Sequence, residues 1–346
     1  MNGRSILLDE IGGRKAAALL EDGRLADLLI DPPDERPMPG AILRGVVDRQ
    51  MKGQGGVFLR LPDGARAFLK QARGLRPGQG LLVQVTGYAE ESKAVPVTPR
   101  FLFKSRYAIL TPEAPGLNVS RAIRDEDARD RLLELLHDGM AGAPDGLGAI
   151  LRSAAELADP EAVAEDIAAQ LALATAILAE PADGAPELFL DGPDAHTLAW
   201  RDWPGPDELD DSAGCFAARG VLEAIDALSG PEALPGGGSV HVEPTRALTA
   251  VDVNTGSDSS PAAGLKANIA AARALPRLLR LRGLAGQVVV DFAPMPKKDR
   301  VALEQVMKAA FRADAVETTF VGWTPLGHAE LTRKRERLPL TETLPR

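Results

Sequence analysis

The sequence of 346 residues contains a single cysteine, Cys215. One cysteine cannot form a disulfide within the chain, and it cannot build a zinc site from cysteine ligands. No stretch of about 18 consecutive apolar residues is present, and the N-terminal segment MNGRSILLDEIGG lacks the apolar core of a signal peptide. Aromatic residues make up only 4% of the chain. These absences predict a cytoplasmic protein with no membrane segment and no disulfide framework.

Basic residues are also fewer than acidic ones, since 40 Lys and Arg stand against 49 Asp and Glu and give a net charge of −9. Contacts to phosphates come from Lys and Arg, so this balance argues against broad, nonspecific nucleic-acid binding. The basic residues are clustered, however, with Arg273, Arg277, Arg280 and Arg282 in one predicted helix and several more in residues 333–337. An enzyme that acts on RNA through local basic groups is therefore compatible with the composition.

Two valine-rich segments each carry an aspartate: residues 247–256 (ALTAVDVNTG) contain Asp252, and residues 286–295 (GQVVVDFAPM) contain Asp291. Strands of this kind normally bury both faces, and a buried carboxylate is costly unless it is paired or bound to a metal. Two carboxylates at one sheet edge suit a hard divalent cation, and Asn254 shares the strand face of Asp252. The alternative is that each aspartate only ends its strand and caps the next loop.

Three segments in this order strongly resemble the catalytic region of the ribonuclease E/G family. They are LPGGGSVHVEPTRALTAVDVNTG (234–256), RLRGLAGQVVVDFAPM (280–295) and GHAELTRKRERLPL (327–340). In that family the aspartates of a [IV]D[IV]N motif and of a VIDF motif hold a catalytic Mg²⁺. The resemblance implies that Asp252 and Asp291 are these metal ligands, and that Asn254 supports the first of them.

The catalytic segments also depart from the family pattern. Pro294 occupies a position that is often a second aspartate in relatives, and the loop after the VDVN motif is shorter than usual. Asn268 matches a helix asparagine of the family motif. Ser260-Pro261 is predicted to begin a long helix that Pro276 should kink, and Asp299 to cap the helix after VVVDFAPM.

Short strands separated by Gly, Asp and Pro turns fill residues 40–87 and predict a small five-stranded barrel. This part resembles the OB-fold RNA-binding domain of the family. The resemblance implies that Phe58 and Phe68 stack on single-stranded RNA and that Lys93 is a basic residue of the same face. From the pattern alone the two phenylalanines could equally be core residues, and Lys93 a solvated loop residue.

Residues 98–180 resemble the family's sensor of a 5′ monophosphate on the RNA, and Arg152 and Ser153 match its arginine and hydroxyl residue. A fork-shaped guanidinium suits phosphate oxygens. Two positions depart from the pattern, because Ser105 replaces a glycine and Glu317 replaces an arginine. The sequence also predicts a helix over 124–139, a strand within 146–156 and a helix that starts at Asp159-Pro160.

The N-terminal segment 5–31 predicts two or three strands with turns at Gly12-Gly13 and Asp22-Gly23, and Asp9 and Glu10 are expected to be surface charges. Residues 187–199 are expected to form hairpin strands and 214–228 one helix. The resemblance implies an α/β (α+β) multidomain fold in five parts. They are an RNase H-like subdomain, first part (1–38); an OB-fold RNA-binding domain (39–97); a sensor region (98–180); the RNase H-like subdomain, second part (181–233); and a DNase I-like catalytic domain (234–346).

The function implied is a Mg²⁺-dependent endoribonuclease that cleaves single-stranded, AU-rich RNA in RNA processing and decay, leaving 5′-phosphate and 3′-hydroxyl ends. Phe58, Phe68, Lys93, Arg280 and Arg282 would contact the RNA. An RNA-binding protein of the same fold that cleaves poorly is the alternative, and a phosphodiesterase for another nucleic acid is a third. Mn²⁺ would suit the same ligands as Mg²⁺.

Relatives continue into a CPxC-type zinc link and a small dimerising domain, whereas the last residues of this chain carry no such cysteines. We therefore expect no zinc and no zinc-linked tetramer. A homodimer and membership of an RNA-degradation complex are both left open. His137 and His196 have no spacing that indicates a metal site and are expected to be structural or surface residues.

Overall fold

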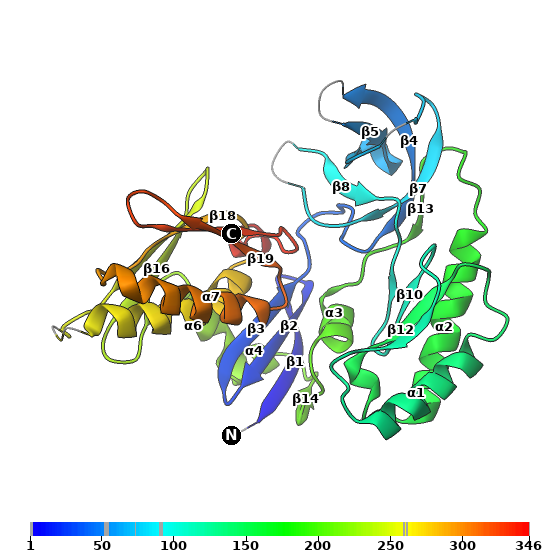
Figure 1. Ribbon diagram of the computed structural model, residues 1–346. Coiled ribbons are helices and arrows are strands. Elements are labelled where there is room, and N and C mark those ends of the chain that lie inside the picture. The colour runs from blue at the N-terminus through cyan, green and yellow to red at the C-terminus, as the bar shows by residue number, and fades with distance from the viewer. Residues whose placement is uncertain are drawn as a thin grey trace. The chain divides into compact units, whose positions relative to one another are not determined.

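The computed structural model describes residues 3–51, 55–72, 74–89, 93–258, 260 and 262–345. The chain divides into two compact units, which are treated separately below. The first contains Met1–Glu35 and Pro206–Arg346, and the second contains Arg36–Gly205. Figure 1 follows the chain through both by colour. No helix in the described part of the chain is long and apolar enough to cross a membrane.

A four-stranded sheet in the first unit has the order β14-β1-β2-β3. Its strands are β1 (Arg4–Ile11), β2 (Arg14–Glu21), β3 (Arg24–Ile30) and β14 (Glu208–Asp210). The antiparallel hairpins turn at Gly12-Gly13 and Asp22-Gly23, as predicted, and all four turn residues have positive φ. The strand β14 pairs in parallel with β1, so the segment after residue 206 returns to the N-terminal strands.

Two short helices, α4 (Cys215–Ala218) and α5 (Val221–Ala227), replace the single helix expected over 214–228. Gly220, with φ 72°, separates them because an α-helix cannot continue through the left-handed region. Both helices pack their buried side chains on the sheet, and Cys215 is among them. Asp9 is half-buried rather than a surface charge, since its carboxylate accepts from Phe216 N at 2.9 Å and from Gly214 N at 3.2 Å.

The larger sheet of the first unit has the order β15-β16-β17-β18-β20-β19. Its strands are β15 (Glu232–Ala233), β16 (Ser239–Pro244), β17 (Thr249–Asn254), β18 (Gly286–Asp291), β19 (Thr318–Trp323) and β20 (Ala329–Arg333). The helices α6 (Ala263–Leu281) and α7 (Arg300–Arg312) lie together along one face, as Figure 1 shows, and α8 (Leu340–Thr343) follows later in the chain. Valines of β16, β17 and β18 and the apolar sides of both helices form one core.

The predicted helices of this region are present with small differences. The helix α6 contains Pro276, and Pro261 lies outside the described residues. Asp299 occupies the position before α7, but its side chain makes no capping hydrogen bond. Leu303, Met307 and Phe311 of α7 are buried.

The barrel predicted for the second unit is confirmed. Its strands are β4 (Ile42–Met51), β5 (Gly56–Arg60), β6 (Arg66–Leu69), β7 (Gly80–Val85) and β8 (Val95–Thr98), with the 3-10 turn η1 (Pro62–Gly64) between β5 and β6. Strands pair in the order β4-β5-β6-β8-β7, and β7 pairs again with β4, which closes the ring. An extra strand, β13 (Glu187–Leu190), pairs with β4 outside this ring.

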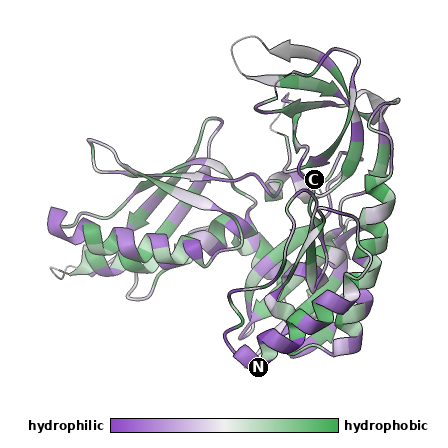
Figure 2. Cartoon of the chain, turned by 45° about the vertical axis from the view of Figure 1, so that its right-hand side comes forward, coloured by the Kyte–Doolittle hydropathy of each residue, from purple (hydrophilic) through white to green (hydrophobic). Residues whose placement is uncertain are grey.

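The remainder of the second unit is a small sheet covered by helices. The sheet has the order β11-β12-β10-β9, with β9 (Phe103–Lys104), β10 (Ala108–Thr111), β11 (Leu117–Val119) and β12 (Gly148–Leu151). The helices α1 (Glu126–Gly139) and α2 (Pro160–Leu178) share its core, and α3 (Ala195–Asp202) follows later in the chain. Figure 2 shows these helices with hydrophobic and hydrophilic sides. Asp159 caps α2 as predicted, through a hydrogen bond from Glu161 N.

The expected hairpin over 187–199 is wrong in its second half. Residues 195–202 form the helix α3, because the Asp194 carboxylate accepts from Thr197 N at 2.7 Å and caps the first turn. The mixed α/β architecture with a closed five-stranded barrel is thus established. The assignment of RNase H-like and DNase I-like parts, and the five boundaries, stay predictions.

Candidate functional site

The two motif aspartates lie side by side on the larger sheet of the first unit. The strands β17 and β18 are parallel neighbours, and Asp252 is directly opposite Asp291 in their register. Adjacent strands in a sheet are about 4.8 Å apart, so the two carboxylates compete for the same region. Like charges directly opposite each other are unfavourable, and a cation between them removes the repulsion.

The expectation that these strands bury both faces is wrong. Side chains of β17 alternate between buried and exposed, with Val251 and Val253 in the core and Asp252 and Asn254 exposed. The Asp291 side chain is 65% exposed. The physical reason is that α6 and α7 cover one face of the sheet only. The aspartates are therefore placed on an accessible face, where ligands and water can reach them.

Asn254 orients the first aspartate. Its Nδ2 donates a hydrogen bond to Asp252 Oδ2 over 2.7 Å, along the same face of β17. The register of this strand with β16 places Ser239 opposite Asn254 and His241 opposite Asp252. Asp252, Asn254 and Asp291 are thus brought together as the sequence predicts, although their roles stay predictions.

Two histidines that the sequence reasoning missed stand at the ends of the same row. His241 is next to Asp252 on β16, and its Nε2 lies 3.4 Å from Ser239 Oγ. His328 immediately precedes β20, where Ala329 is opposite Val290, and its Nε2 lies 3.6 Å from Asp291 Oδ1. Three neighbouring strands and the residue just before a fourth therefore present His, Asp, Asp and His in one line. The feature that would have identified the two histidines is their shared register with the aspartates. That register depends on strand pairings that the sequence does not show directly.

The donor set fits a hard divalent cation with few protein ligands. Within the described residues, no group of three or more His, Cys, Asp and Glu side chains converges closely enough to hold a metal ion. Mg²⁺ characteristically uses one or two carboxylates and completes its octahedron with waters and substrate phosphates. The pair Asp252 and Asp291, both exposed, matches that requirement.

Asn268 has a structural role close to this site. It is fully buried, its Nδ2 donates to Ala293 O at 2.9 Å, and its Oδ1 accepts from Ala293 N at 2.9 Å. Both bonds fix the backbone two residues after Asp291. Asn268 therefore holds the segment that follows the second aspartate.

The two barrel phenylalanines form an aromatic pair. Phe58 on β5 is directly opposite Phe68 on β6, and their ring centroids are 5.3 Å apart. Both are only half-buried, and Arg66 lies 5.5 Å from the Phe58 ring. Gly56 lets the Phe68 ring lie against the strand, since a Cβ there would come within 2.5 Å of the ring. Lys93 is exposed in the loop before β8.

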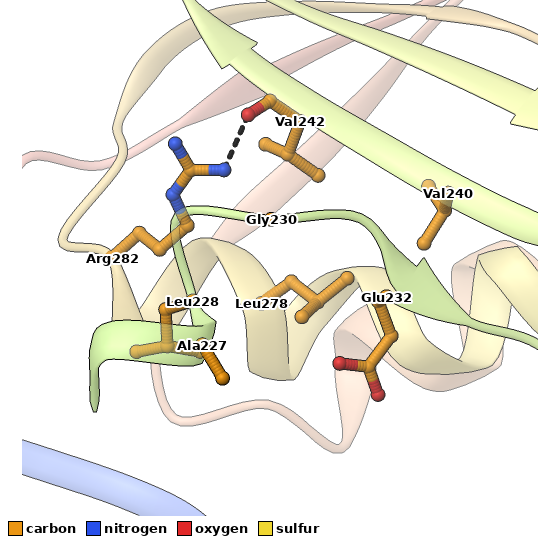
Figure 3. Close-up of a pocket in the computed structure, with 8 residues that line it drawn as sticks. All are labelled: Ala227, Leu228, Gly230, Glu232, Val240, Val242, Leu278 and Arg282. Carbon is orange, nitrogen blue, oxygen red and sulfur yellow. Dashed lines mark hydrogen bonds between the residues drawn. The ribbon is translucent and has the colours of Figure 1, made fainter. Parts of the chain in front are cut away.

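The two helix arginines predicted to contact RNA make contacts within their own unit. Arg280 forms ion pairs with Asp27 and with the buried Asp314. Arg282 donates to the carbonyl of Val242 at the rim of a small pocket, shown in Figure 3, and its side chain is half-buried. Burial lowers the pKa of Arg282, with Glu243 acting in the opposite direction. Both side chains have partners within the fold, and their contact with RNA stays a prediction.

Arg152 is likewise held by groups of its own unit. Its Nη1 donates to the carbonyls of Ser105 at 2.5 Å and Arg201 at 2.8 Å, and its Nη2 donates to Asp202 Oδ1 at 3.0 Å. The neighbouring Ser153 is exposed at the start of the 3-10 turn η2 (Ser153–Ala155). The side chains predicted to sense a phosphate are present, but an internal carboxylate already occupies the guanidinium.

Three cations surround that carboxylate. Besides Arg152, Lys104 Nζ lies 2.7 Å and Arg201 Nη2 2.8 Å from Asp202. Partial burial raises the pKa of Asp202, but Arg201 and Lys104 outweigh it and hold the pKa at about 2. Asp202 therefore stays ionised at neutral pH and takes the place that an external anion would need.

Several known proteins are similar to this chain in sequence. The sequence model of the Ribonuclease E/G family matches residues 103–210 and 208–336. The chain is 30% identical to Ribonuclease E of Nostoc sp. over 377 residues, which cover 92% of this chain and 54% of that protein. It is 29% identical to Ribonuclease E of Synechocystis sp. over 332 residues, covering 82% of this chain and 49% of that protein.

The chain is also 26% identical to Ribonuclease G of Escherichia coli K12 over 402 residues, which cover 98% of this chain and 81% of that protein. The chain thus spans about half the length of these ribonuclease E relatives and about four fifths of this ribonuclease G.

Proposed function

Since the chain belongs to the ribonuclease E/G family, we propose that it is an endoribonuclease that cuts single-stranded RNA with a divalent cation held by Asp252 and Asp291. The observation that carries the proposal is the direct opposition of these two carboxylates on the exposed face of β17 and β18. A protein that only bound RNA would gain nothing from placing two negative charges side by side where RNA phosphates must approach.

The residues of the site have distinct tasks. Asp252 and Asp291 would hold Mg²⁺, which when bound activates a water and neutralises charge on the phosphate. Asn254 keeps the Asp252 carboxylate in one orientation through its 2.7 Å hydrogen bond. In the reaction an oxygen–phosphorus bond to water forms and the bond from phosphorus to the 3′ oxygen breaks, leaving 5′-phosphate and 3′-hydroxyl ends. Mn²⁺ suits the same oxygen ligands.

The barrel supplies the RNA contacts. Phe58 and Phe68 offer half-exposed rings on neighbouring strands, and aromatic rings stack on bases of any sequence. Lys93 adds a positive charge in the loop before β8. The preference for AU-rich RNA is part of the proposal, since unpaired A and U segments offer the bases to these rings.

The test compares wild type with Asp291→Asn, which removes a charge at constant size, and with Gln287→Ala as a matched control on the same exposed face of β18. A fluorescent single-stranded RNA is incubated with Mg²⁺ or with EDTA, beside a DNA of equal sequence. We expect Mg²⁺-dependent cleavage of the RNA by wild type and by the control, and none by Asp291→Asn. Sequencing of the product ends tests the 5′-phosphate and 3′-hydroxyl chemistry.

The alternative is an RNA-binding protein of this fold that cleaves poorly. It is favoured by Pro294, three residues after Asp291, where relatives often carry an aspartate. RNA binding by wild type without any cleavage in Mg²⁺ or Mn²⁺ would sink the nuclease proposal and leave this alternative. Equal cleavage of RNA and DNA would instead indicate a phosphodiesterase with a wider substrate range.

A further inference from the structure

His328 is the side chain nearest to the aspartate pair for which the proposed reaction has so far no use. Its Nε2 lies 3.6 Å from Asp291 Oδ1, and its side chain is 34% exposed. This distance is longer than a hydrogen bond, so the ring is not locked to the carboxylate. An imidazole beside a metal-binding carboxylate and open to solvent is placed to meet whatever ligand approaches the ion.

The backbone fixes His328 in this position. Its N–H donates to Thr324 Oγ1 at 3.0 Å, and its carbonyl accepts from Thr324 N at 2.9 Å. The intervening turn needs Gly327, whose φ is +100°. The next residue, Ala329, pairs with Val290 of β18. A constrained turn therefore holds His328 in place beside Asp291.

The row across the sheet gives the two histidines different surroundings. His241, at the other end, has its Nε2 3.4 Å from Ser239 Oγ on its own strand. His328 instead points its Nε2 towards the carboxylate pair. The described residues also contain no trio of acidic, histidine or cysteine side chains that converges as a metal site, so an added metal ligand is not what the geometry shows.

We propose that His328 is a catalytic residue that donates a hydrogen bond from its ring to a non-bridging oxygen of the scissile phosphodiester. This inference rests on the proposed nuclease function. A phosphate bound to an ion that Asp252 and Asp291 hold would approach the exposed sheet face on which the ring beside Asp291 also stands. A neutral imidazole has one N–H donor, which is sufficient, because the phosphate oxygen gains negative charge in the transition state.

Single-turnover cleavage tests the proposal with three substitutions. His328→Leu removes the donor, His328→Gln keeps an N–H donor, and His137→Leu is a control at an exposed histidine of α1 in the other unit. We expect His328→Leu to slow cleavage about 100-fold, the lower end for loss of one such donor. His328→Gln should recover about a tenth of the wild-type rate or more, and the control should match wild type.

Two binding measurements separate a contact with substrate from a structural role. RNA affinity is measured with Ca²⁺ in place of Mg²⁺, and Mn²⁺ affinity by electron paramagnetic resonance. Both should stay within about two-fold of wild type in His328→Leu, since only charge that develops in the transition state is lost. Mn²⁺ binding that weakens as much as the rate would overturn the proposal, because His328 would then act on the metal through Asp291.

A sulfur substitution identifies the oxygen concerned. RNA with one stereoisomer of a phosphorothioate at the scissile position should slow wild type about tenfold without rescue by Mn²⁺, because sulfur accepts hydrogen bonds poorly. The same sulfur should not slow cleavage by His328→Leu any further, because this variant has already lost the hydrogen bond. If the sulfur slows the variant as much as it slows wild type, the proposal is overturned. If wild type and His328→Leu cleave RNA equally well, only the role of His328 is overturned. If wild type itself does not cleave RNA, the proposed function is overturned.

Discussion

Asn254 donates a hydrogen bond to the carboxylate of Asp252 from two positions further along the same face of β17, over 2.7 Å. This bond engages one carboxylate oxygen, Oδ2, and limits the rotation of the Asp252 side chain. Partners that orient metal ligands typically account for about 10–100-fold in metal affinity or activity.

We therefore expect Asn254→Ala to lower cleavage by about 10–100-fold and to raise the Mg²⁺ concentration for half-maximal rate. Titrating Mg²⁺ in a cleavage assay measures both effects. Gln287→Ala, which removes an amide from the same face of β18, should change neither. A normal Mg²⁺ titration for Asn254→Ala would show that Asp252 needs no support.

The pairing of the aspartates was predictable from sequence, whereas much of their surroundings was not. Two apolar strands that each end in a polar motif and are joined by a helix predict parallel neighbours, and Asp252 and Asp291 lie opposite each other accordingly. His328 joins them only through β20, which is antiparallel and follows after another helix and strand. Its register depends on a turn at Gly327, and no local pattern predicts that.

The charge pattern of a helix likewise does not show which partners its arginines have. Arg280 and Arg282 form a basic cluster in the sequence, but Arg280 pairs with Asp314 and with Asp27, which is far away in the chain on β3. Arginines that form a solvated basic face of a helix and arginines that form buried ion pairs look the same in the local sequence. The difference lies in the acids that the fold brings to them, and these became visible only in the structure.

The aromatic pair of the barrel predicts a specific loss of RNA affinity. Phe58→Leu keeps most of the apolar volume but removes the flat ring that would stack on a base. Stacking contributes about 1–3 kcal/mol per base, so the dissociation constant for single-stranded RNA should rise by about 5- to 150-fold. Fluorescence anisotropy in Ca²⁺ measures it without cleavage.

Leu188→Ala is the matched control, since Leu188 is 48% exposed on β13, which pairs with the barrel strand β4. It should leave affinity unchanged. If both substitutions weaken binding equally, the aromatic pair has no special role. If neither does, the barrel does not hold the RNA through this face.

The Asp202 carboxylate predicts that cleavage depends little on the 5′ end of the RNA. A 5′ phosphate would have to displace a carboxylate that Arg152, Lys104 and Arg201 already bind. Wild type should therefore cut 5′-monophosphorylated and 5′-hydroxylated RNA at similar rates. Asp202→Asn removes the competing charge and should make the monophosphorylated RNA the better substrate.

Paired rate measurements on the two RNAs give the ratio directly. Asp191→Asn, an exposed carboxylate of the same unit, serves as control and should keep the wild-type ratio. A strong preference for the 5′ monophosphate in wild type would contradict the prediction. It would show that the phosphate displaces Asp202 or binds elsewhere.

A buried ion-pair network in the first unit predicts how stability changes with acid. Asp27 is buried on β3, accepts a bidentate pair of hydrogen bonds from Arg337 and lies 3.2 Å from Arg280. Burial raises the pKa of Asp27, but Arg337 and Arg280 together lower it below its ordinary value. The charged carboxylate therefore stabilises the fold above the unfolded-state pKa of about 3.9, and this contribution is lost as the pH falls towards the folded-state value.

Asp27→Asn removes one partner of a buried pair and leaves Arg337 without its counter-charge, which typically costs about 3–5 kcal/mol. In urea unfolding at pH 7, the free energy of unfolding of the first unit should fall by that amount, so that its transition moves to a lower urea concentration. Below about pH 4 the difference in the free energy of unfolding between variant and wild type should shrink, because Asp27 of wild type loses its charge as well. Asp211→Asn, at an exposed position, should follow wild type at every pH. A difference that stays constant down to pH 2 would mean that Asp27 acts through packing and not through its charge.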